Sequence, residues 1–202
     1  MRRCAIMPWS GWSDQQLWSH LRDNEQGVDH GSRVWLRERL REWGETHSLL
    51  DVGCGTGVEY EGIRREGLQT EYVGLDACER AIALARRTYP ETRMRRWWVG
   101  DAGHLPCADN SFDVVLLRHV LEHLPDFRPA VREALRVACC QVVLIFFWPP
   151  GEEQIPRMHE GTHWNRYRLA DVLDCLDDEC SVRIETAPDL GVNGNFALVG
   201  HL

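Results

Sequence analysis

The sequence predicts an α/β fold with a doubly wound, mostly parallel sheet. Short apolar runs alternate with amphipathic, helix-like segments, and several of these runs end in an acid or a glycine. The first run, residues 49–52, leads into glycines at alternate positions, Gly53, Gly55 and Gly57. Such glycines permit a tight turn and the close approach of a ligand at the carboxyl edge of a doubly wound sheet.

The spacing of the glycines indicates the charge of that ligand. A dinucleotide fingerprint is G-x-G-x-x-G, but here the third glycine comes one residue early and Val58 stands in its usual place. Asp51 precedes the first glycine by two residues. Its carboxylate would repel a pyrophosphate and could hold an ammonium group directly or through water. The loop therefore favours a ligand with a cationic amine and disfavours an oxidoreductase that uses a dinucleotide.

Acids end the next predicted strands as well. Residues 71–76 form a second strand that ends in Asp76, one crossover helix and one strand after Asp51. Asp76 should lie at the sheet edge beside the glycine loop, where a carboxylate can accept both hydroxyls of a ribose. Residues 97–102 predict a third strand end that carries Asp101. A fourth strand and the segment after it follow at 111–123, a helix at 134–137 and a fifth strand at 141–148.

This order of motifs, with D-x-G-x-G-x-G at residues 51–57, resembles the class I S-adenosylmethionine-dependent methyltransferases, in particular their methyltransferase type 11-like domain. The resemblance covers residues 45–150 well and extends more loosely to the C-terminus. It implies a Rossmann-like, doubly wound, mostly parallel seven-stranded sheet with a C-terminal antiparallel hairpin and an N-terminal helical lid. It also implies S-adenosyl-L-methionine as the cofactor.

The resemblance further implies a cofactor site spread over four strand ends. It places Asp51 at the amino group of the cofactor, Asp76 at the ribose and Asp101 at the adenine. Arg118 and His119 should lie near the methionine portion and the methyl group. The full expected set is Asp51, Gly53, Cys54, Gly55, Gly57, Asp76, Ala77, Asp101, Ala102, Arg118 and His119.

Three histidines are candidates for a general base. The sulfonium of the cofactor is already a strong methyl donor, so the protein must mainly align the acceptor and keep water out. A base helps when the acceptor is a hydroxyl or a protonated amine. Histidine titrates near neutral pH, and we rank His119 first, His163 second and His159 third.

We expect a single methyltransferase domain over residues 1–202, in three parts. Residues 1–44 form an N-terminal helical cap, with helices at 14–22 and 32–43; the Trp-rich first helix is the better lid, and the second could simply cover the sheet. Residues 45–150 form the cofactor-binding core. Residues 151–202 supply a substrate-side loop, a helix at 168–177 and a closing hairpin of 181–186 and 196–202. Trp148, Trp164 and Tyr167 either line the acceptor or pack in the core.

Two sequence patterns typical of zinc proteases occur, and we discount both. Residues 159–163 match H-E-x-x-H, which requires a helix, but Pro156, Gly161 and Thr162 are poor residues for a helix interior. Residues 119–123 match H-x-x-E-H, but these letters fall where the methyltransferase pattern expects them and no third ligand is evident. We therefore expect no metal, and we expect His123 to support packing or hydrogen bonds.

Charge and composition limit the partners. A net charge of −8 argues against a general nucleic-acid binder, and the basic and aromatic stretch at 93–98 fits a strand with solvated outer residues. No apolar stretch approaches the length of a membrane helix, and we recognise no secretory signal. The eight cysteines are then expected as reduced thiols in a cytoplasmic protein. The expected partner is a small-molecule methyl acceptor, without membrane or nucleic acid, and the protein is a monomer or a homodimer.

The leading hypothesis is methyl transfer to an O, N or S atom of a small molecule. One alternative is methylation of a protein or peptide, which would need an open groove. Another is a non-catalytic partner subunit that binds S-adenosylmethionine, against which the intact glycines and acids argue.

Overall fold

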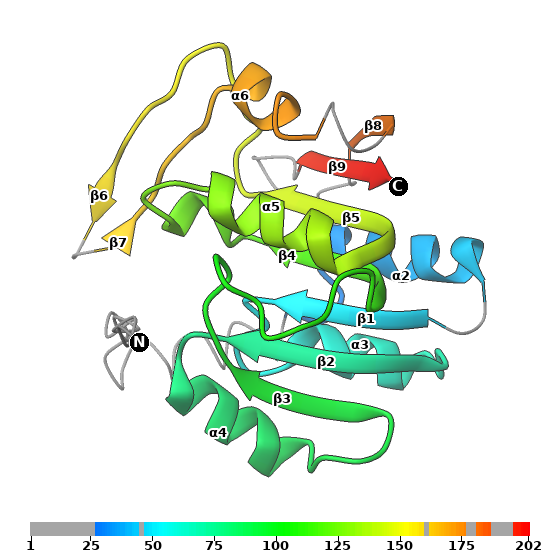
Figure 1. Cartoon of the computed structure of the whole chain (residues 1–202). Helices are drawn as coiled ribbons and strands as arrows, with labels where there is room; N and C mark the ends of the chain where they lie inside the picture. The colour runs from blue at the N-terminus through cyan, green and yellow to red at the C-terminus, as the bar shows by residue number, and fades with distance from the viewer. Residues whose placement is uncertain (1–26, 45–46, 160–161, 177–180, 187–195) are drawn as a thin grey trace.

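The computed structural model describes residues 27–44, 47–159, 162–176, 181–186 and 196–202 and contains a seven-stranded sheet (Figure 1). The strand order is β3-β2-β1-β4-β5-β9-β8. Strands β1 to β5 pair in parallel, and β9 pairs antiparallel with both β5 and β8. The strands are β1 (His47–Val52), β2 (Thr70–Asp76), β3 (Arg95–Val99), β4 (Phe112–Arg118), β5 (Ala138–Phe146), β8 (Ser181–Thr186) and β9 (Phe196–His201). The predicted fold class is confirmed.

Helices cover both faces of this sheet. The helices are α2 (Gly31–Trp43), α3 (Val58–Arg65), α4 (Glu79–Thr88), α5 (Arg128–Val137) and α6 (Leu169–Leu173), with a 3-10 turn η1 (Leu121–His123) after β4. Neighbouring strand residues point to opposite cores: Leu49 and Leu116 pack with α2, α3 and α4, whereas Leu50 and Leu117 pack with α5 and α6. Burial on both faces explains why these strands read as continuous apolar runs.

The chain reverses its direction of winding between β1 and β4. From β1 it proceeds to β2 and β3 on one side, and β4 and β5 lie on the other side (Figure 1). Ligands of doubly wound sheets bind at this switch point, outside the carboxyl ends of the strands. The glycine loop follows β1 and His119 follows β4, so the predicted site residues meet at the switch point.

Several predicted boundaries were wrong. The expected substrate-side loop after residue 150 is not simply irregular, because it contains the hairpin strands β6 (Met158–His159) and β7 (Thr162–His163). The fifth strand ends at Phe146 rather than 148, just before Pro149 and Pro150. By contrast, the third strand, Arg95–Val99, ends within the predicted stretch 97–102. Helix α6 is shorter than the predicted helix.

The structure describes only residues 27–44 of the expected N-terminal helical cap. The predicted helix at 32–43 is α2, which ends at Gly44 with a positive φ of 131°, as a C-cap glycine permits. Trp35, Leu36 and Leu40 of α2 are buried in the core beside β1 and β4, so this helix covers the sheet. The predicted lid helix at 14–22 and the residues that join the two strands of the predicted closing hairpin lie outside the described residues. Among the helices that the structure describes, none is long and apolar enough to cross a membrane.

Candidate functional site

The amides of the glycine loop are used within the protein. Gly53 N and Cys54 N both donate to the carbonyl of Leu75, at 2.7 and 3.1 Å. Gly55 N donates to Oδ2 of Asp76 at 2.8 Å, and Gly57 N donates to the Cys54 carbonyl at 3.0 Å. An anion cradle requires such amides to point at the ligand. These four amides are therefore not free to cradle a diphosphate.

Two of the glycines are required by packing inside the protein. Gly53 has a φ of +78°, and a Cβ there would lie 2.3 Å from Cγ2 of Val120. Gly57 has a φ of +86°, and a Cβ there would lie 2.4 Å from the Trp97 ring. The Cys54 side chain is buried in the core, so only its backbone is left for the predicted cofactor role.

Asp51 lies beneath the loop as a buried acid. Its Oδ2 accepts a hydrogen bond of 2.5 Å from the Tyr72 hydroxyl. Burial raises the pKa of Asp51 to about 7, and the nearby Glu59 carboxylate acts in the same direction. The Tyr72 hydrogen bond and the charges of Arg33 and Arg118 lower this pKa. A cationic group placed beside Asp51 would stabilise its ionised form.

Glu59 is a second buried acid, which the sequence prediction missed. Its carboxylate lies 3.4 Å from Nε of Arg33, and within the described part of the chain neither of its oxygens has a hydrogen-bond partner. Burial raises its pKa, and Arg33 and Arg118 oppose this rise. An acid in the first turn of the helix after a glycine loop was a usable signal in the sequence.

Arg118 connects the end of β4 to the start of α2. Its Nε donates to Oγ of Ser32 at 3.0 Å, and another guanidinium nitrogen lies 3.5 Å from Nδ1 of His30. Burial, with Arg33 nearby, lowers the pKa of Arg118 to about 9, so the guanidinium keeps its charge at neutral pH. The sequence contained no signal for this contact, because α2 and β4 are far apart in the chain.

Asp76 and Asp101 lie at the ends of β2 and β3. Oδ2 of Asp76 accepts from Gly55 N and Oδ1 accepts from Cys78 N, both at 2.8 Å. Burial raises the pKa of Asp76 and these two backbone hydrogen bonds oppose the rise. Each carboxylate oxygen has a second lone pair, so Asp76 can hold the loop and still accept hydrogen bonds from hydroxyls.

Asp101 is exposed and its Oδ1 accepts a hydrogen bond from Gly103 N at 2.8 Å. Residues 77 and 102 are partly exposed beside these acids.

His119 occupies a strained position directly after β4. Its φ is +55°, a left-handed value that is uncommon for residues other than glycine. The ring stacks on Phe147 with the centroids 3.6 Å apart, and it meets the His30 ring edge-on at 6.4 Å. Strain of this kind gathers at functional sites, where the surrounding structure holds the side chain in place.

A cluster of aromatic rings, which we call the aromatic wall, extends from Phe147. The Phe147 ring lies 6.0 Å from Trp164 and 6.3 Å from Trp148, and the two tryptophans lie 6.0 Å apart. Two of the three aromatic residues named from the sequence, Trp148 and Trp164, therefore lie together in this cluster. Tyr167 packs in the core against Phe127 at 4.5 Å, so packing explains this third residue.

The hairpin β6–β7 is fastened to η1. Nδ1 of His123 hydrogen-bonds the His163 carbonyl at 2.8 Å, and Asn165 N donates to the Glu122 carbonyl at 2.8 Å. The buried Glu122 carboxylate accepts a hydrogen bond of 2.5 Å from Phe147 N. Burial raises the pKa of Glu122 to about 7. His163 is therefore held near His123 and the aromatic wall through its backbone, and in Figure 1 the hairpin lies on the side where β1 and β5 end.

Neither discounted metal pattern has the geometry of a zinc protease. His159 and His163 lie on the paired strands β6 and β7 instead of on one helix face. His119 precedes η1 with a left-handed φ, so His119 and His123 do not share a regular helix face either.

Comparisons with known proteins agree with this geometry. Residues 50–146 match the methyltransferase domain family. The chain is 31% identical over 169 residues to 2-phytyl-1,4-naphtoquinone methyltransferase of Synechocystis, covering 80% of this chain and 62% of the relative. It is 31% identical over 108 residues to demethylmenaquinone methyltransferase of Staphylococcus aureus, covering 52% of this chain and 45% of the relative. The chain thus spans about half the length of the curated relatives it matches.

A solved structure shares the fold. The protein of Haloferax volcanii that was solved in complex with the Trm112 methyltransferase activator superposes with a TM-score of 0.71 at 17% identity. The likeness covers 93% of this chain and 96% of that one. At this identity it shows a common fold.

Proposed function

Because residues 50–146 match the methyltransferase domain family, we propose that the chain is a class I S-adenosylmethionine-dependent methyltransferase with S-adenosyl-L-methionine as its cofactor. We further propose that it transfers a methyl group to an O, N or S atom of a small molecule. The observation that carries this proposal is the arrangement of acids at the switch point. Buried Asp51 and half-buried Asp76 flank a loop in which four amides are already hydrogen-bonded within the protein. That set suits a ligand with an ammonium group and ribose hydroxyls.

The residues of this chain would then act by binding and alignment. Bound S-adenosylmethionine supplies an activated methyl group on its sulfonium. Asp51 holds the ammonium end, and Asp76, fixed by two amides, accepts from the ribose. The exposed acid Asp101, with Ala102 beside it, faces the adenine. His119, whose ring stacks on Phe147, would lie beside the reacting atoms and accept the proton of a hydroxyl or amine acceptor. His163 is the second candidate for this role.

The aromatic wall favours a flat acceptor. Phe147, Trp148 and Trp164 are partly exposed, Phe147 stacks on His119, and aromatic surfaces attract other flat rings. The two curated relatives are named as methyltransferases of a naphthoquinone and of demethylmenaquinone. We therefore place phenolic and quinone-type rings first among the acceptors to be screened.

Calorimetric titration tests the cofactor assignment first. We expect S-adenosylmethionine and S-adenosylhomocysteine to bind with micromolar affinity and NAD to give no heat of binding. The acceptor screen follows, with mass spectrometry to detect a gain of one methyl group on each candidate ring compound. Binding of NAD in place of the two adenosyl compounds would overturn the proposal.

Another protein could complete the site. The Haloferax volcanii structure was solved with an activator of methyltransferases, and this provides a specific reason to consider a partner-dependent subunit. Cofactor binding without methyl transfer to any acceptor, followed by transfer after a partner is added, would favour this second candidate.

A further inference from the structure

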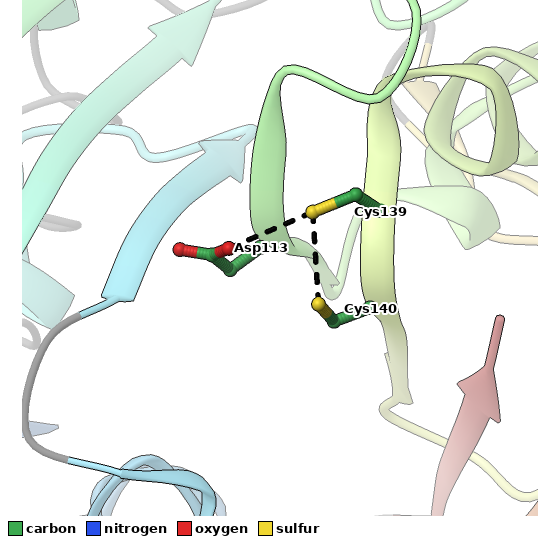
Figure 2. Close-up of side chains that lie close together, drawn as sticks. All are labelled: Asp113, Cys139 and Cys140. Atoms are coloured by element: carbon green, nitrogen blue, oxygen red, sulfur yellow. Dashed lines mark hydrogen bonds between the residues drawn. The ribbon is translucent and has the colours of Figure 1, made fainter.

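The edge of the sheet opposite the switch point carries a compact cluster of two thiols and a carboxylate (Figure 2). Asp113 comes from the start of β4, and Cys139 and Cys140 come from the start of β5. Because β4 begins at this edge and His119 follows its other end, the cluster is separate from the proposed cofactor site.

A β-bulge brings both thiols to the same place. Successive residues of a regular strand point to opposite faces, so adjacent cysteines would normally diverge. Here Phe112 pairs with Ala138 and Val114 pairs with Gln141, so Asp113 alone opposes both Cys139 and Cys140. Bulges re-aim side chains in this way. In Figure 2 both sulfur atoms lie on the side of β5 that faces β4 and Asp113.

The separations match the edges of a tetrahedral metal site. The two Sγ atoms lie 3.6 Å apart, and Sγ of Cys139 lies 3.5 Å from Oδ1 of Asp113. A tetrahedral zinc ion with ordinary bond lengths requires about 3.8 Å between two sulfur ligands and about 3.5 Å between sulfur and oxygen. All three ligand atoms lie within 4.8 Å of one another. A cation could therefore enter with little rearrangement.

Ser48 of β1 holds the carboxylate in position. Oδ2 of Asp113 accepts from Ser48 N at 2.8 Å and from Ser48 Oγ at 2.9 Å. Asp113 N in turn donates to Ser48 Oγ at 2.9 Å. Oδ1 is thereby directed toward the thiols. Outer hydrogen bonds of this kind orient the ligands of metal sites.

We propose that Asp113, Cys139 and Cys140 form a binding site for a thiophilic divalent cation of the zinc class. Both thiols lose their protons on binding, and water supplies the fourth ligand on the exposed side at Cys139. The ion would join β4 to β5 and, through Ser48, to β1. Its role is to stabilise the sheet, because the cluster lies at the edge away from the cofactor.

Disulfide formation is a less suitable use of these thiols. The Cα atoms of adjacent residues are about 3.8 Å apart, which is shorter than the usual span of a disulfide.

Cadmium titration of the reduced, chelator-treated full chain tests the site. We expect one Cd²⁺ per chain with thiolate-to-metal absorbance, displaced by Zn²⁺, and a higher unfolding temperature. Cys139→Ser and Cys140→Ser should each weaken binding at least about 10-fold, and Ser48→Ala about 10-fold. Cys175→Ser, a half-buried cysteine outside the cluster, is the matched control and should bind as the wild type does.

The affinity for S-adenosylhomocysteine should be the same in all four variants, which separates this test from that of the proposed function. Cd²⁺ binding that survives in the Cys139→Ser/Cys140→Ser double variant would overturn the proposal. So would a wild-type protein that shows no thiolate absorbance at stoichiometric Cd²⁺.

Discussion

Asp76 combines two tasks in one side chain, because it holds Gly55 and Cys78 and is proposed to bind the ribose. Asp76→Ala should weaken the binding of S-adenosylhomocysteine by about 1.5–3 kcal/mol, roughly 10- to 150-fold, since charge-assisted hydrogen bonds are lost. Calorimetry measures this change directly. Glu79→Ala, at an exposed position in the next turn, is the control. An unchanged affinity of the Asp76 variant would remove the ribose assignment.

His119 is proposed to act on the acceptor, so its loss should affect turnover more than cofactor binding. We expect His119→Ala to lower kcat by about 100-fold, the low end for general-base catalysis, while the dissociation constant of S-adenosylhomocysteine changes little. Phe147→Leu keeps the imidazole but removes the stacked ring, and it should give an intermediate loss. If His119→Ala weakened cofactor binding and left kcat intact, His119 would be a binding residue.

Gly57 shows how tightly the loop is packed. Gly57→Ala should lower the free energy of unfolding by about 2–5 kcal/mol, because it adds a left-handed strain and an overlap with Trp97. Gly67→Ala is the matched control: its φ is also positive, +68°, but no atom lies within 4 Å of the added Cβ. Chemical denaturation should therefore show a loss of only about 1–2 kcal/mol for the control. Equal losses in the two variants would show that backbone strain alone matters.

The residues that sequence analysis identified at the site are those with a local signal. Asp51 and Asp76 end apolar strands, and the alternate glycines stand in one short motif. Arg33 and Phe147 were missed because their positions depend on how α2 and β5 pack. Glu59 was missed although its place in the first turn after the glycine loop was a local signal. The stack of Phe147 on His119 joins residues that no sequence periodicity connects.

At the scale of elements, strands with acids or glycines at their ends were predicted best. Their boundaries follow from burial on both faces of a parallel sheet, which produces continuous apolar runs. The strands β6 and β7 were missed because each has only two residues, too few for an alternating pattern. The β-bulge at Cys139 and Cys140 was equally hidden, since it is a property of the pairing with β4.

The buried side chain of Asn165 also holds the hairpin β6–β7 in place. Nδ2 of Asn165 donates to the Leu124 carbonyl at 2.8 Å, and Oδ1 accepts from Arg157 N at 3.1 Å. Asn165→Ala should cost about 1–3 kcal/mol locally, because these buried partners lose their hydrogen bonds. Hydrogen exchange should then rise over residues 149–159 and 162–165.

The same variant should lower kcat/KM for the acceptor while cofactor affinity stays constant, because the hairpin carries Trp164 and His163 near the aromatic wall. Glu153→Ala, exposed in the same segment, should change neither quantity. Exchange that is unaltered by Asn165→Ala would show that other contacts fasten the hairpin.

At the scale of the whole molecule, the site contains buried acids that the unliganded protein stabilises in their protonated form. Burial raises the pKa values of Asp51 and Glu122 to about 7, above their ordinary values. The stability that such acids contribute is complete below about pH 4 and is lost as the pH rises through 7. The unfolding temperature of the unliganded protein should therefore fall between pH 5.5 and about 7.5.

Cofactor binding should show the opposite dependence on pH. An ammonium group pairs with ionised Asp51, so the dissociation constant of S-adenosylhomocysteine should fall roughly tenfold between about pH 5.5 and 7.5. Asp51→Asn keeps an acceptor for the Tyr72 hydroxyl but cannot ionise, so its weaker binding should be nearly independent of pH. Glu122 titrates in both proteins, and the difference between the two curves therefore isolates Asp51. Parallel curves would place the ammonium group elsewhere, with buried Glu59 as the next candidate because both its oxygens lack a hydrogen-bond partner among the described residues.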